Sequence, residues 1–382
     1  DLFNPYSCSL GLWITLCING RFEALTIVLI LENATGMLYK ATFKPIHNRN
    51  SMKYDVFGIG NALVDKEFEV TDAFLAEHGI QKGMMTLIDQ ERQQQLLSGL
   101  TETFGLKKRA SGGSAANSIV AVSQFGGKAF YACKVANDET GEFYMHDLHA
   151  AGVATKLDQV RCASEGVTGK CMVMVTPDAE RTMNTFLGIT ADFSEAELHL
   201  DELKQAKYLY IEGYLVTSDV SRAAALKARQ VAAENGVKTA MTFSDPAMVR
   251  FFRQGVDEMI GNGVDILFCN REEACVFTGK DDLEEAIAAI RPFAQKVVIT
   301  LGSKGALVVD DAGRTEIAAN PVKAVDTNGA GDMFAGAFLY GITQGMDNAQ
   351  AGKLASLAAA RIVTVFGARL SKQAHQEILA VI

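Results

Sequence analysis

Asp326-Thr327-Asn328-Gly329-Ala330-Gly331-Asp332 is the stretch of this 382-residue chain that decides its fold class. It follows an apolar, strand-like run at residues 322–325 and leads into a helical pattern at residues 333–340. Two glycines at a strand-to-helix turn let the backbone approach a ligand closely, and the unpaired N–H groups of the first helical turn then point at an anion. The stretch therefore predicts a phosphate site at the end of a strand.

Asp332 lies in the first turn of the expected helix, beside that anion. A carboxylate is a poor neighbour for a phosphate unless it accepts a proton from a hydroxyl that is about to attack the phosphorus. An Asp at this position also interacts favourably with the helix dipole. The spacing alone therefore leaves two interpretations open, a catalytic base and a helix-end charge.

From about Lys53 onward, short apolar runs alternate with helical patterns. This alternation is typical of a mostly parallel sheet flanked by helices, which binds ligands at the carboxyl ends of its strands. The expected strands cover residues 54–60, 208–212, 237–243, 264–269 and 297–301, and the expected helices cover residues 90–103, 114–125, 218–235 and 281–294. The sequence therefore predicts an α/β fold.

One segment breaks the alternation. Residues 170–176 and 181–186 are strand-like and are joined by Pro177-Asp178-Ala179-Glu180, a turn-forming cluster, so they predict a β-hairpin. Residues 84–89 are a candidate further strand beside it. We expect a small β lid, formed by insertions around residues 62–90 and 163–190 of one domain that spans residues 52–382.

The first 51 residues differ from the rest. Their apolar stretches are too short to span a bilayer and are interrupted by polar residues. A signal peptide fits poorly, because the expected positive n-region is absent. Met52 stands directly before the first convincing strand. We expect residues 1–51 to be an extension outside the main domain, derived from upstream sequence or an expression vector; a native arm for targeting or oligomer contact is the alternative.

Composition limits the class of ligand. The formal net charge is −9 and no run of lysine and arginine occurs, which argues against a nucleic-acid partner or an anionic membrane surface. The seven cysteines are scattered singly and form no C-x-x-C pair, so we expect reduced thiols in a cytoplasmic protein. These features favour a small-molecule ligand that is held locally.

Two motifs together resemble a known enzyme family. Residues 326–332 look like the D-T-x-G-A-G-D signature of the ribokinase-like (PfkB) carbohydrate and nucleoside kinases, and Gly112-Gly113-Ser114-Ala115-Ala116-Asn117 resembles the same family's N-terminal signature. The resemblance runs from about residue 54 to the C-terminus. It implies a ribokinase-like fold and an ATP- and Mg²⁺-dependent kinase. It also implies that Asp332 is the catalytic base and that Gly329, Ala330 and Gly331 form the anion hole.

The resemblance also implies a substrate site. Asn61 and Asp65, which follow the first strand, resemble the family's ligands for substrate hydroxyls, and a carboxylate can accept from two adjacent hydroxyls. Gly112 and Gly113 would let a sugar lie against the backbone, and Asn117 would supply a further amide donor. A loop Asp that caps a helix, and ordinary helix entry at the glycines, are the alternative interpretations.

A nucleotide site is implied by two further stretches. Asn270 and Glu273 follow a strand and are similar to the family's N-x-x-E motif, which orders Mg²⁺ and phosphate mainly through water. Residues 300–305 look like the family's nucleotide loop. The loop residues that we expect to contact ATP are Thr300, Gly302, Lys304 and Gly305. Since no G-x-x-x-x-G-K-[ST] stretch exists, ATP binding needs this different architecture.

Two charged residues complete the expected site. Arg181, on the hairpin, matches a lid arginine that would offset transition-state charge, although a solvated hairpin charge is the alternative. Relatives often need K⁺ near a loop that corresponds to Asp326 and the Gly367-Ala368 turn. Whether Asp326 contributes to such a monovalent-cation site in this chain stays open.

The most specific function that the sequence predicts is transfer of the ATP γ-phosphate to the primary, 5′-type hydroxyl of an adenosine-like nucleoside. Residues 60–65 and the hairpin around Arg181 most resemble the adenosine kinase branch of the family. A kinase for a free sugar such as ribose or fructose is the alternative, and a ligand-binding protein without catalysis is a different class of function. We expect a cytoplasmic monomer or homodimer.

Overall fold

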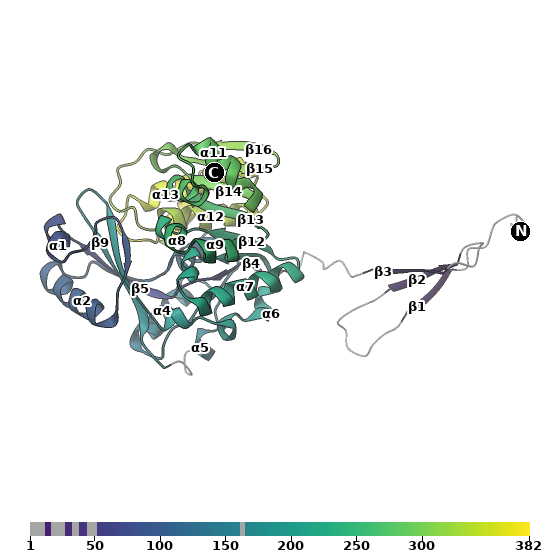
Figure 1. Ribbon diagram of the computed structural model, residues 1–382, viewed down its shortest axis with the longest axis horizontal. Helices are drawn as coiled ribbons and strands as arrows, with labels where there is room; N and C mark the ends of the chain where they lie inside the picture. Colours follow the sequence, from purple (N-terminus) through teal and green to yellow (C-terminus); the bar gives the residue numbers. More distant parts are fainter. Residues whose placement is uncertain (1–11, 17–26, 33–37, 44–51, 161–164) are drawn as a thin grey trace, which may run out of the picture. The chain divides into compact units, whose positions relative to one another are not determined.

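The computed structural model of the chain describes residues 12–16, 27–32, 38–43, 52–160 and 165–382 (Figure 1). The chain divides into two compact units, residues 1–51 and 52–382. In the first unit, the strands β1 (Leu12–Leu16), β2 (Ile27–Glu32) and β3 (Leu38–Phe43) form an antiparallel sheet in that order. That this unit lies outside the functional domain stays a prediction.

The second unit is built around an eight-stranded sheet in the order β16-β15-β14-β13-β12-β11-β4-β8. Strands β8 to β14 of this order are mutually parallel, and β15 and β16 are antiparallel additions at one edge. The strand bounds are β4 (Tyr54–Ile59), β8 (Ala129–Ala132), β11 (Ala206–Ile211), β12 (Lys238–Thr242), β13 (Val264–Asn270), β14 (Ala294–Thr300), β15 (Ala306–Asp310) and β16 (Gly313–Ile317). The predicted, mostly parallel sheet is confirmed.

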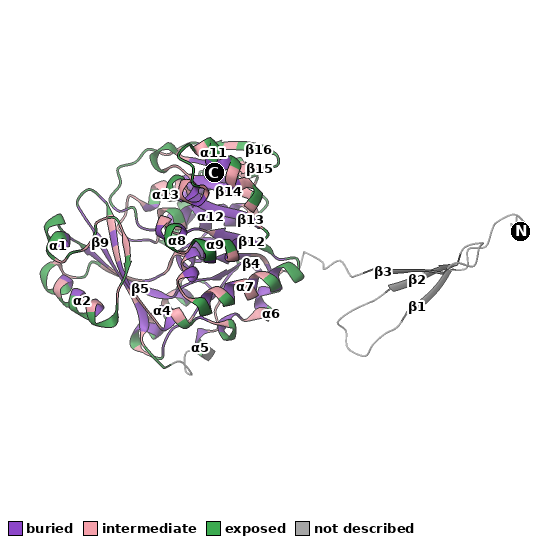
Figure 2. Ribbon diagram, in the orientation of Figure 1, coloured by how far each residue is buried: buried purple, intermediate pink, exposed green. Residues whose placement is uncertain are grey.

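Helices cover both faces of this sheet. One face packs against α3 (Ser114–Gln124), α4 (Glu139–Ala150), α12 (Ala330–Thr343), α13 (Asn348–Ile362) and α14 (Lys372–Leu379). The other packs against α7 (Asp219–Glu234), α8 (Pro246–Phe251), α9 (Arg253–Ile260), α10 (Arg271–Thr278) and α11 (Leu283–Ile290). Val56 and Phe57, adjacent in β4, belong to opposite cores. Figure 2 shows the strands buried beneath partly exposed helices.

A second sheet of five strands has the order β6-β10-β9-β5-β7. Its strands are β5 (Leu63–Glu69), β6 (Met85–Leu87), β7 (Lys108–Gly112), β9 (Thr168–Val175) and β10 (Arg181–Gly188). The structure has the expected β9–β10 hairpin, and β6 pairs with β10. Strands β5 and β7 were not predicted. Their sequences, LVDKEFE and KRASG, lack the continuous apolar runs on which the other strand predictions rested.

The two faces of this small sheet have different surroundings. The helices α1 (Asp72–Glu77) and α2 (Gln90–Phe104) cover one face, through a core that includes Phe68, Leu96 and Met172. The opposite face carries a separate apolar cluster around Leu63, Cys171 and Val173. One face is therefore closed by helices, and the other is available to line a cavity.

One predicted strand and one predicted helix end are wrong. Residues 322–325 form no strand: Val322 and Val325 are about half exposed, and the Val325 N–H donates to the carbonyl of Val363, 2.7 Å away. The helix expected over residues 281–294 ends at Ile290. A 3₁₀ turn (Arg291–Phe293) that contains Pro292 follows, and β14 begins at Ala294. Proline has no N–H to continue an α-helix.

The helices of the described residues include none that is long and apolar enough to cross a membrane.

A chain that begins at Met52 is predicted to fold and to keep full activity. Both sheets of the second unit and all the expected site residues lie after this position. Its midpoint of thermal unfolding should lie within about 1 °C of that of the full chain, because a loss of about 1 kcal/mol would already shift a domain of this size by about 1.4 °C. Insolubility, or loss of activity at an unchanged midpoint, would show that residues 1–51 contribute to the enzyme.

Candidate active site

A cavity of about 240 Å³ lies where the large sheet, the small sheet and the start of α12 meet. Its polar lining comes partly from the carboxyl ends of parallel strands, where α/β folds bind ligands. The residues that follow or end these strands are Asn61, Glu212, Thr242, Asn270 and Thr300. The cavity also brings together these expected site residues: Asp65, Gly113, Asn117, Arg181, Glu273, Gly329, Ala330, Gly331 and Asp332.

The loop before α12 requires glycine at one position. Gly329 is the N-cap of the helix and has a φ of 73°, in the left-handed region that favours glycine. A Cβ atom at Gly329 would lie 2.7 Å from the Cβ of Ala368. At Gly331, by contrast, a Cβ would meet no atom within 4 Å, since this residue borders the cavity. The first turn of a helix leaves its N–H groups without intrahelical partners, so the loop can bind an anion.

Asp332 is held by hydrogen bonds from α3. The Ser114 hydroxyl donates to Asp332 Oδ1 at 2.6 Å, and the Asn117 amide Nδ2 donates to Asp332 Oδ2 at 3.0 Å. Burial raises the pKa of Asp332, while both hydrogen bonds and the charges of Arg181 and Arg369 act in the opposite direction. Asn117, expected as a donor to substrate, therefore gives its amide to Asp332, although its side chain also lines the cavity.

Asp65 and Asn61, the expected ligands for substrate hydroxyls, both line the cavity. Burial raises the pKa of Asp65 to about 8, with a further contribution from the nearby Glu67. Gly112 does not line the cavity but leaves room for Asp65, because its Cβ would lie 2.1 Å from that carboxyl group. Gly113 has a φ of 99°, and its Cβ would lie 2.3 Å from the Asn61 carbonyl oxygen. The two glycines therefore allow the close packing of both candidate ligands.

Glu212 is a site residue that the sequence reasoning missed. Its carboxylate accepts hydrogen bonds from the Asn61 backbone N–H at 3.2 Å, from Asn61 Nδ2 at 3.1 Å and from the Ala115 N–H at 2.8 Å. Burial raises its pKa to about 7. It fixes Asn61 relative to the start of α3. The available signal was a carboxylate directly after a buried strand, because α/β folds bind ligands at the carboxyl ends of their parallel strands.

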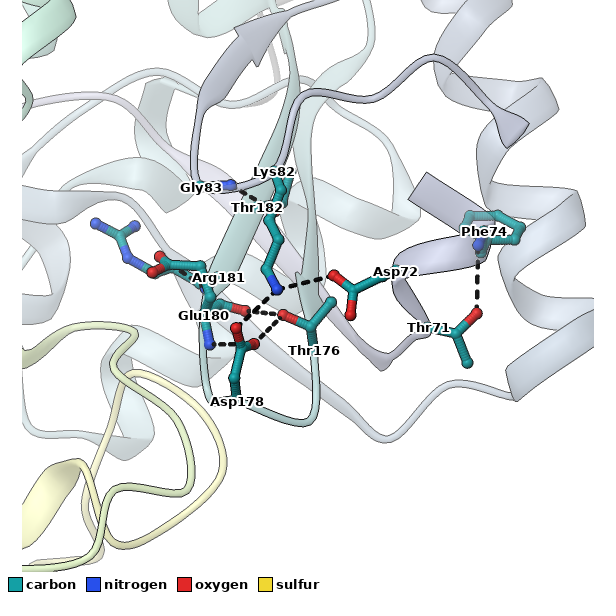
Figure 3. A network of polar contacts seen from close by, with 10 residues as sticks. All are labelled: Thr71, Asp72, Phe74, Lys82, Gly83, Thr176, Asp178, Glu180, Arg181 and Thr182. Carbon is teal, nitrogen blue, oxygen red and sulfur yellow. Dashed lines mark hydrogen bonds and ion pairs between the residues drawn. The ribbon is translucent and has the colours of Figure 1, made fainter. Parts of the chain in front are cut away.

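Arg181 begins β10, directly after the hairpin turn of residues 176–180. Asp178 stabilises this turn: its Oδ1 accepts from Thr176 Oγ1 at 2.7 Å, and its Oδ2 accepts from Lys82 Nζ at 2.7 Å. Lys82 also donates to Asp72 at the start of α1, at 2.8 Å. Figure 3 shows these contacts, with the Arg181 guanidinium pointing away from them. Arg181 lines the cavity instead.

The hairpin turn also contacts the loop before α12. Thr327 Oγ1 donates to the carbonyl oxygen of Ala179, 3.3 Å away. Ala179 has a φ of 65°, an uncommon conformation for a residue with a side chain. The hairpin and the anion-binding loop are therefore in direct contact beside the cavity.

Asn270 and Glu273, expected beside the nucleotide, form a capping box that starts α10. Glu273 accepts from the Asn270 N–H at 2.9 Å and from Asn270 Nδ2 at 3.1 Å, and burial raises its pKa to about 8. A neighbouring pocket shares Asn270 and Thr300 with the cavity and adds Gly302 and Lys304. The N-x-x-E stretch at residues 270–273 and the loop at residues 300–305 therefore line two adjoining pockets.

Gly305 and Asp326 lie outside both pockets. Gly305 has a φ of 92° in the turn before β15, and its Cβ would lie 2.0 Å from the Ile317 carbonyl oxygen. Asp326 is fully buried and accepts from the N–H groups of Asn328 and Gly367, each at 2.8 Å. Its carboxylate therefore joins the anion-binding loop to the C-terminal turn. Within the described residues, no group of three or more His, Cys, Asp or Glu side chains could hold a metal ion.

The chain is similar to known proteins in sequence and in fold. Residues 85–375 match the sequence model of a protein family described as "pfkB family carbohydrate kinase". A probable sugar kinase from Rhizobium etli CFN 42 is 36% identical, with a TM-score of 0.80 over 87% of this chain and 100% of that one. The adenosine kinase from Sinorhizobium meliloti is 38% identical, with a TM-score of 0.79 over 86% of this chain and 99% of that one.

The sequence comparison agrees. The adenosine kinase of Saccharomyces cerevisiae is 29% identical over 308 residues, which are 76% of this chain and 88% of that protein. The expected ribokinase-like fold is confirmed by the R. etli and S. meliloti structures, which the chain matches over almost their whole length. The chain therefore belongs to the PfkB family of carbohydrate kinases and is an ATP-dependent carbohydrate or nucleoside kinase.

Proposed function

We propose that this enzyme transfers the γ-phosphoryl group of ATP to the primary, 5′-type hydroxyl of an adenosine-like nucleoside, with Asp332 as general base. The observation that carries the proposal is the position of Asp332. It lies two residues after the Gly329 turn that starts α12, and both its oxygens accept hydrogen bonds. A carboxylate that accepts two donors is favoured in its ionised form and can accept the hydroxyl proton.

The transferred phosphoryl group would lie at the start of α12. The N–H groups contributed by Gly329, Ala330 and Gly331 would stabilise the charge that develops on its oxygens. Arg181, from the small sheet, lines the same cavity and would add a positive charge there. ATP would extend from this point into the neighbouring pocket, beside Thr300, Gly302 and Lys304.

The residues present fit a Mg²⁺ ion that is bound chiefly through the nucleotide. Mg²⁺ keeps several waters and usually takes one or two carboxylates besides the substrate phosphates. Glu273 borders the cavity, and both its oxygens already accept from Asn270, which favours contact through water over direct ligation. When bound, the ion would neutralise phosphate charge.

The lining of the cavity supports a nucleoside over a free sugar. Asn61 and Asp65 supply the polar groups that ribose hydroxyls need. The small sheet adds an apolar wall, whose members are Leu63, Met85, Leu87, Met183 and Leu187. A free sugar offers hydroxyl groups on most of its surface, whereas a purine base offers a large apolar face to such a wall. Similarity to proteins named adenosine kinase points the same way.

A kinase for ribose, fructose or a related sugar is the second candidate, because the chain also resembles a probable sugar kinase. A protein that binds without catalysis is disfavoured, since Asp332 and the glycine turn are intact. A requirement for K⁺ near Asp326, a cytoplasmic location, and the choice between monomer and homodimer stay predictions.

Asp332→Asn should lower kcat by at least about a hundredfold, because general-base catalysis typically contributes 10²–10⁴ in rate. The amide can keep its oxygen toward Asn117 and turn its NH₂ group toward the Ser114 hydroxyl, so the fold should be retained. Stability should hardly change, and the affinity for ATP should stay within a few-fold of the parent. A steady-state assay at saturating substrates measures kcat, and near-parental turnover would remove Asp332 from the catalytic role.

Adenosine should be phosphorylated with a kcat/KM at least about tenfold above those of ribose and fructose, because contact of the base with the apolar wall adds more than 1.4 kcal/mol of binding. Met183→Ala should reduce this preference about tenfold while leaving the KM for ATP unchanged. Met172→Ala is a matched control, because Met172 lies in the same sheet but packs under α1 and α2. Equal or better use of a free sugar by the parent enzyme would favour the second candidate.

A further inference from the structure

Arg369 is a largely buried arginine that lies outside both family motifs, residues 112–117 and 326–332. It follows the Gly367-Ala368 turn, and its side chain is only 11% exposed. Its Nε donates to Asn117 Oδ1 at 3.0 Å, and its Nη1 donates to Ser111 Oγ at 2.5 Å and to Asp147 Oδ2 at 3.0 Å. It does not line the cavity. Any effect of Arg369 on the reaction must therefore pass through another residue.

The contact with Asn117 determines which way that amide faces. A guanidinium group can only donate hydrogen bonds, so the Asn117 atom next to Arg369 must be the oxygen. The NH₂ group of the same amide is then directed at Asp332 Oδ2, 3.0 Å away. Without Arg369 the amide could rotate and present its oxygen to the carboxylate, which would be repulsive. Arg369 thus selects the orientation in which Asn117 stabilises ionised Asp332.

The other side of the guanidinium is fixed by Asp147, from α4. Asp147 Oδ2 also accepts from the backbone N–H of Ser111 at 2.8 Å and from the Ser111 hydroxyl at 2.6 Å. Ser111 belongs to β7, the edge strand of the small sheet. Ser111 on β7 and Asp147 on α4 both accept from Arg369 Nη1, and the charge-assisted bond to Asp147 is the stronger kind, so two elements hold Arg369 in place.

We propose that Arg369 is a positioning residue for catalysis: through Asn117 it keeps the Asp332 carboxylate oriented and ionised for proton transfer. The inference rests on the proposed role of Asp332 as general base, and it assigns to Arg369 a contribution to kcat that does not depend on contact with either substrate.

The electrostatic surroundings of Asp332 agree with this assignment. Arg181 and Arg369 are the cations that lower the pKa of Asp332 against the effect of burial. The other titratable groups that face Asp332 are acids. Each of them either carries a negative charge, which favours the protonated form of Asp332, or is neutral at neutral pH. These groups are Asp65 on β5, Tyr210 on β11, and Glu212 and Tyr214 after β11. Loss of Arg369 would leave Arg181 as the remaining cation of this set.

The test compares Arg369→Met and Arg369→Lys with the parent in the pH dependence of kcat at saturating ATP and nucleoside. Arg369→Met should lower kcat at neutral pH by about ten- to a hundredfold and move the acidic limb of the profile upward by about one pH unit. Arg369→Lys keeps the charge but not the fork, so its limb should move less while its kcat stays below that of the parent. KM for ATP should stay within about twofold in both.

Arg361→Met is the matched control for loss of an arginine. Arg361 lies in the last turn of α13, is 52% exposed and lies 3.8 Å from Glu377. Its pH profile should equal that of the parent. If Arg369→Met does not fold, Asp147→Asn provides a second variant, because it removes the carboxylate partner of Arg369 and leaves the Asn117 contact in place. Asp147→Asn should lower kcat less than Arg369→Lys does.

Asp332→Asn separates failure of this inference from failure of the proposed function. If Asp332→Asn turns over at a near-parental rate, the base assignment is wrong and the role of Arg369 is overturned with it. If Asp332→Asn is inactive but folded Arg369 variants keep the parental kcat and pH profile, only the positioning role is overturned. The positioning role would also be overturned if Arg369→Met and Arg369→Lys lowered kcat by the same factor and the unfolding midpoint by the same amount, with no shift of the acidic limb. A residue with a merely structural role would behave in that way.

Discussion

A half-buried carboxylate at the positive end of a helix is the constraint on which this candidate active site depends. Burial disfavours the ionised form of Asp332, since desolvation raises its pKa. The two donors from α3, Ser114 and Asn117, lower this pKa and so act against the effect of burial. The helix end at which we propose the phosphate binds thus carries a carboxylate able to accept a proton.

The fold supplies these donors through close packing of α3 against α12. A Cβ atom at Gly336, on α12, would lie only 2.4 Å from the Ser118 carbonyl oxygen on α3. The two helices can therefore pack this closely only because position 336 is glycine. The Asp326 carboxylate holds the preceding loop against the C-terminal turn through the Gly367 N–H. Residues far apart in the sequence therefore meet at the start of α12: α3 donates to Asp332, and the turn before α14 donates to Asp326.

The sequence predicted the parts of the site that depend on local geometry. The turn at residues 326–332 needs glycine where φ is positive, and polar residues such as Asn61 and Asn270 stand at the ends of buried strands. Each of these signals can be recognised within a short stretch of sequence. Arg369 carries no such signal, because its partners Asn117 and Asp147 lie 252 and 222 residues away. Glu212 does follow a buried strand, but its partners Asn61 and Ala115 lie 151 and 97 residues away, so its role is not visible in the surrounding sequence. Residues 322–325 misled the prediction because their apolar side chains are half exposed in an extended loop rather than paired in a sheet.

The central claim, that Asp332 is the ionised proton acceptor, can be tested by ¹³C NMR of the enzyme labelled at aspartate carboxyl carbons, with Asp332→Asn used to assign the resonance. In the complex with a nucleoside and a non-hydrolysable ATP analogue, the account predicts that Asp332 has the chemical shift of a carboxylate throughout the pH range in which the enzyme is active. An Asp332 resonance that stays at the position of a protonated carboxyl group across that range would contradict it.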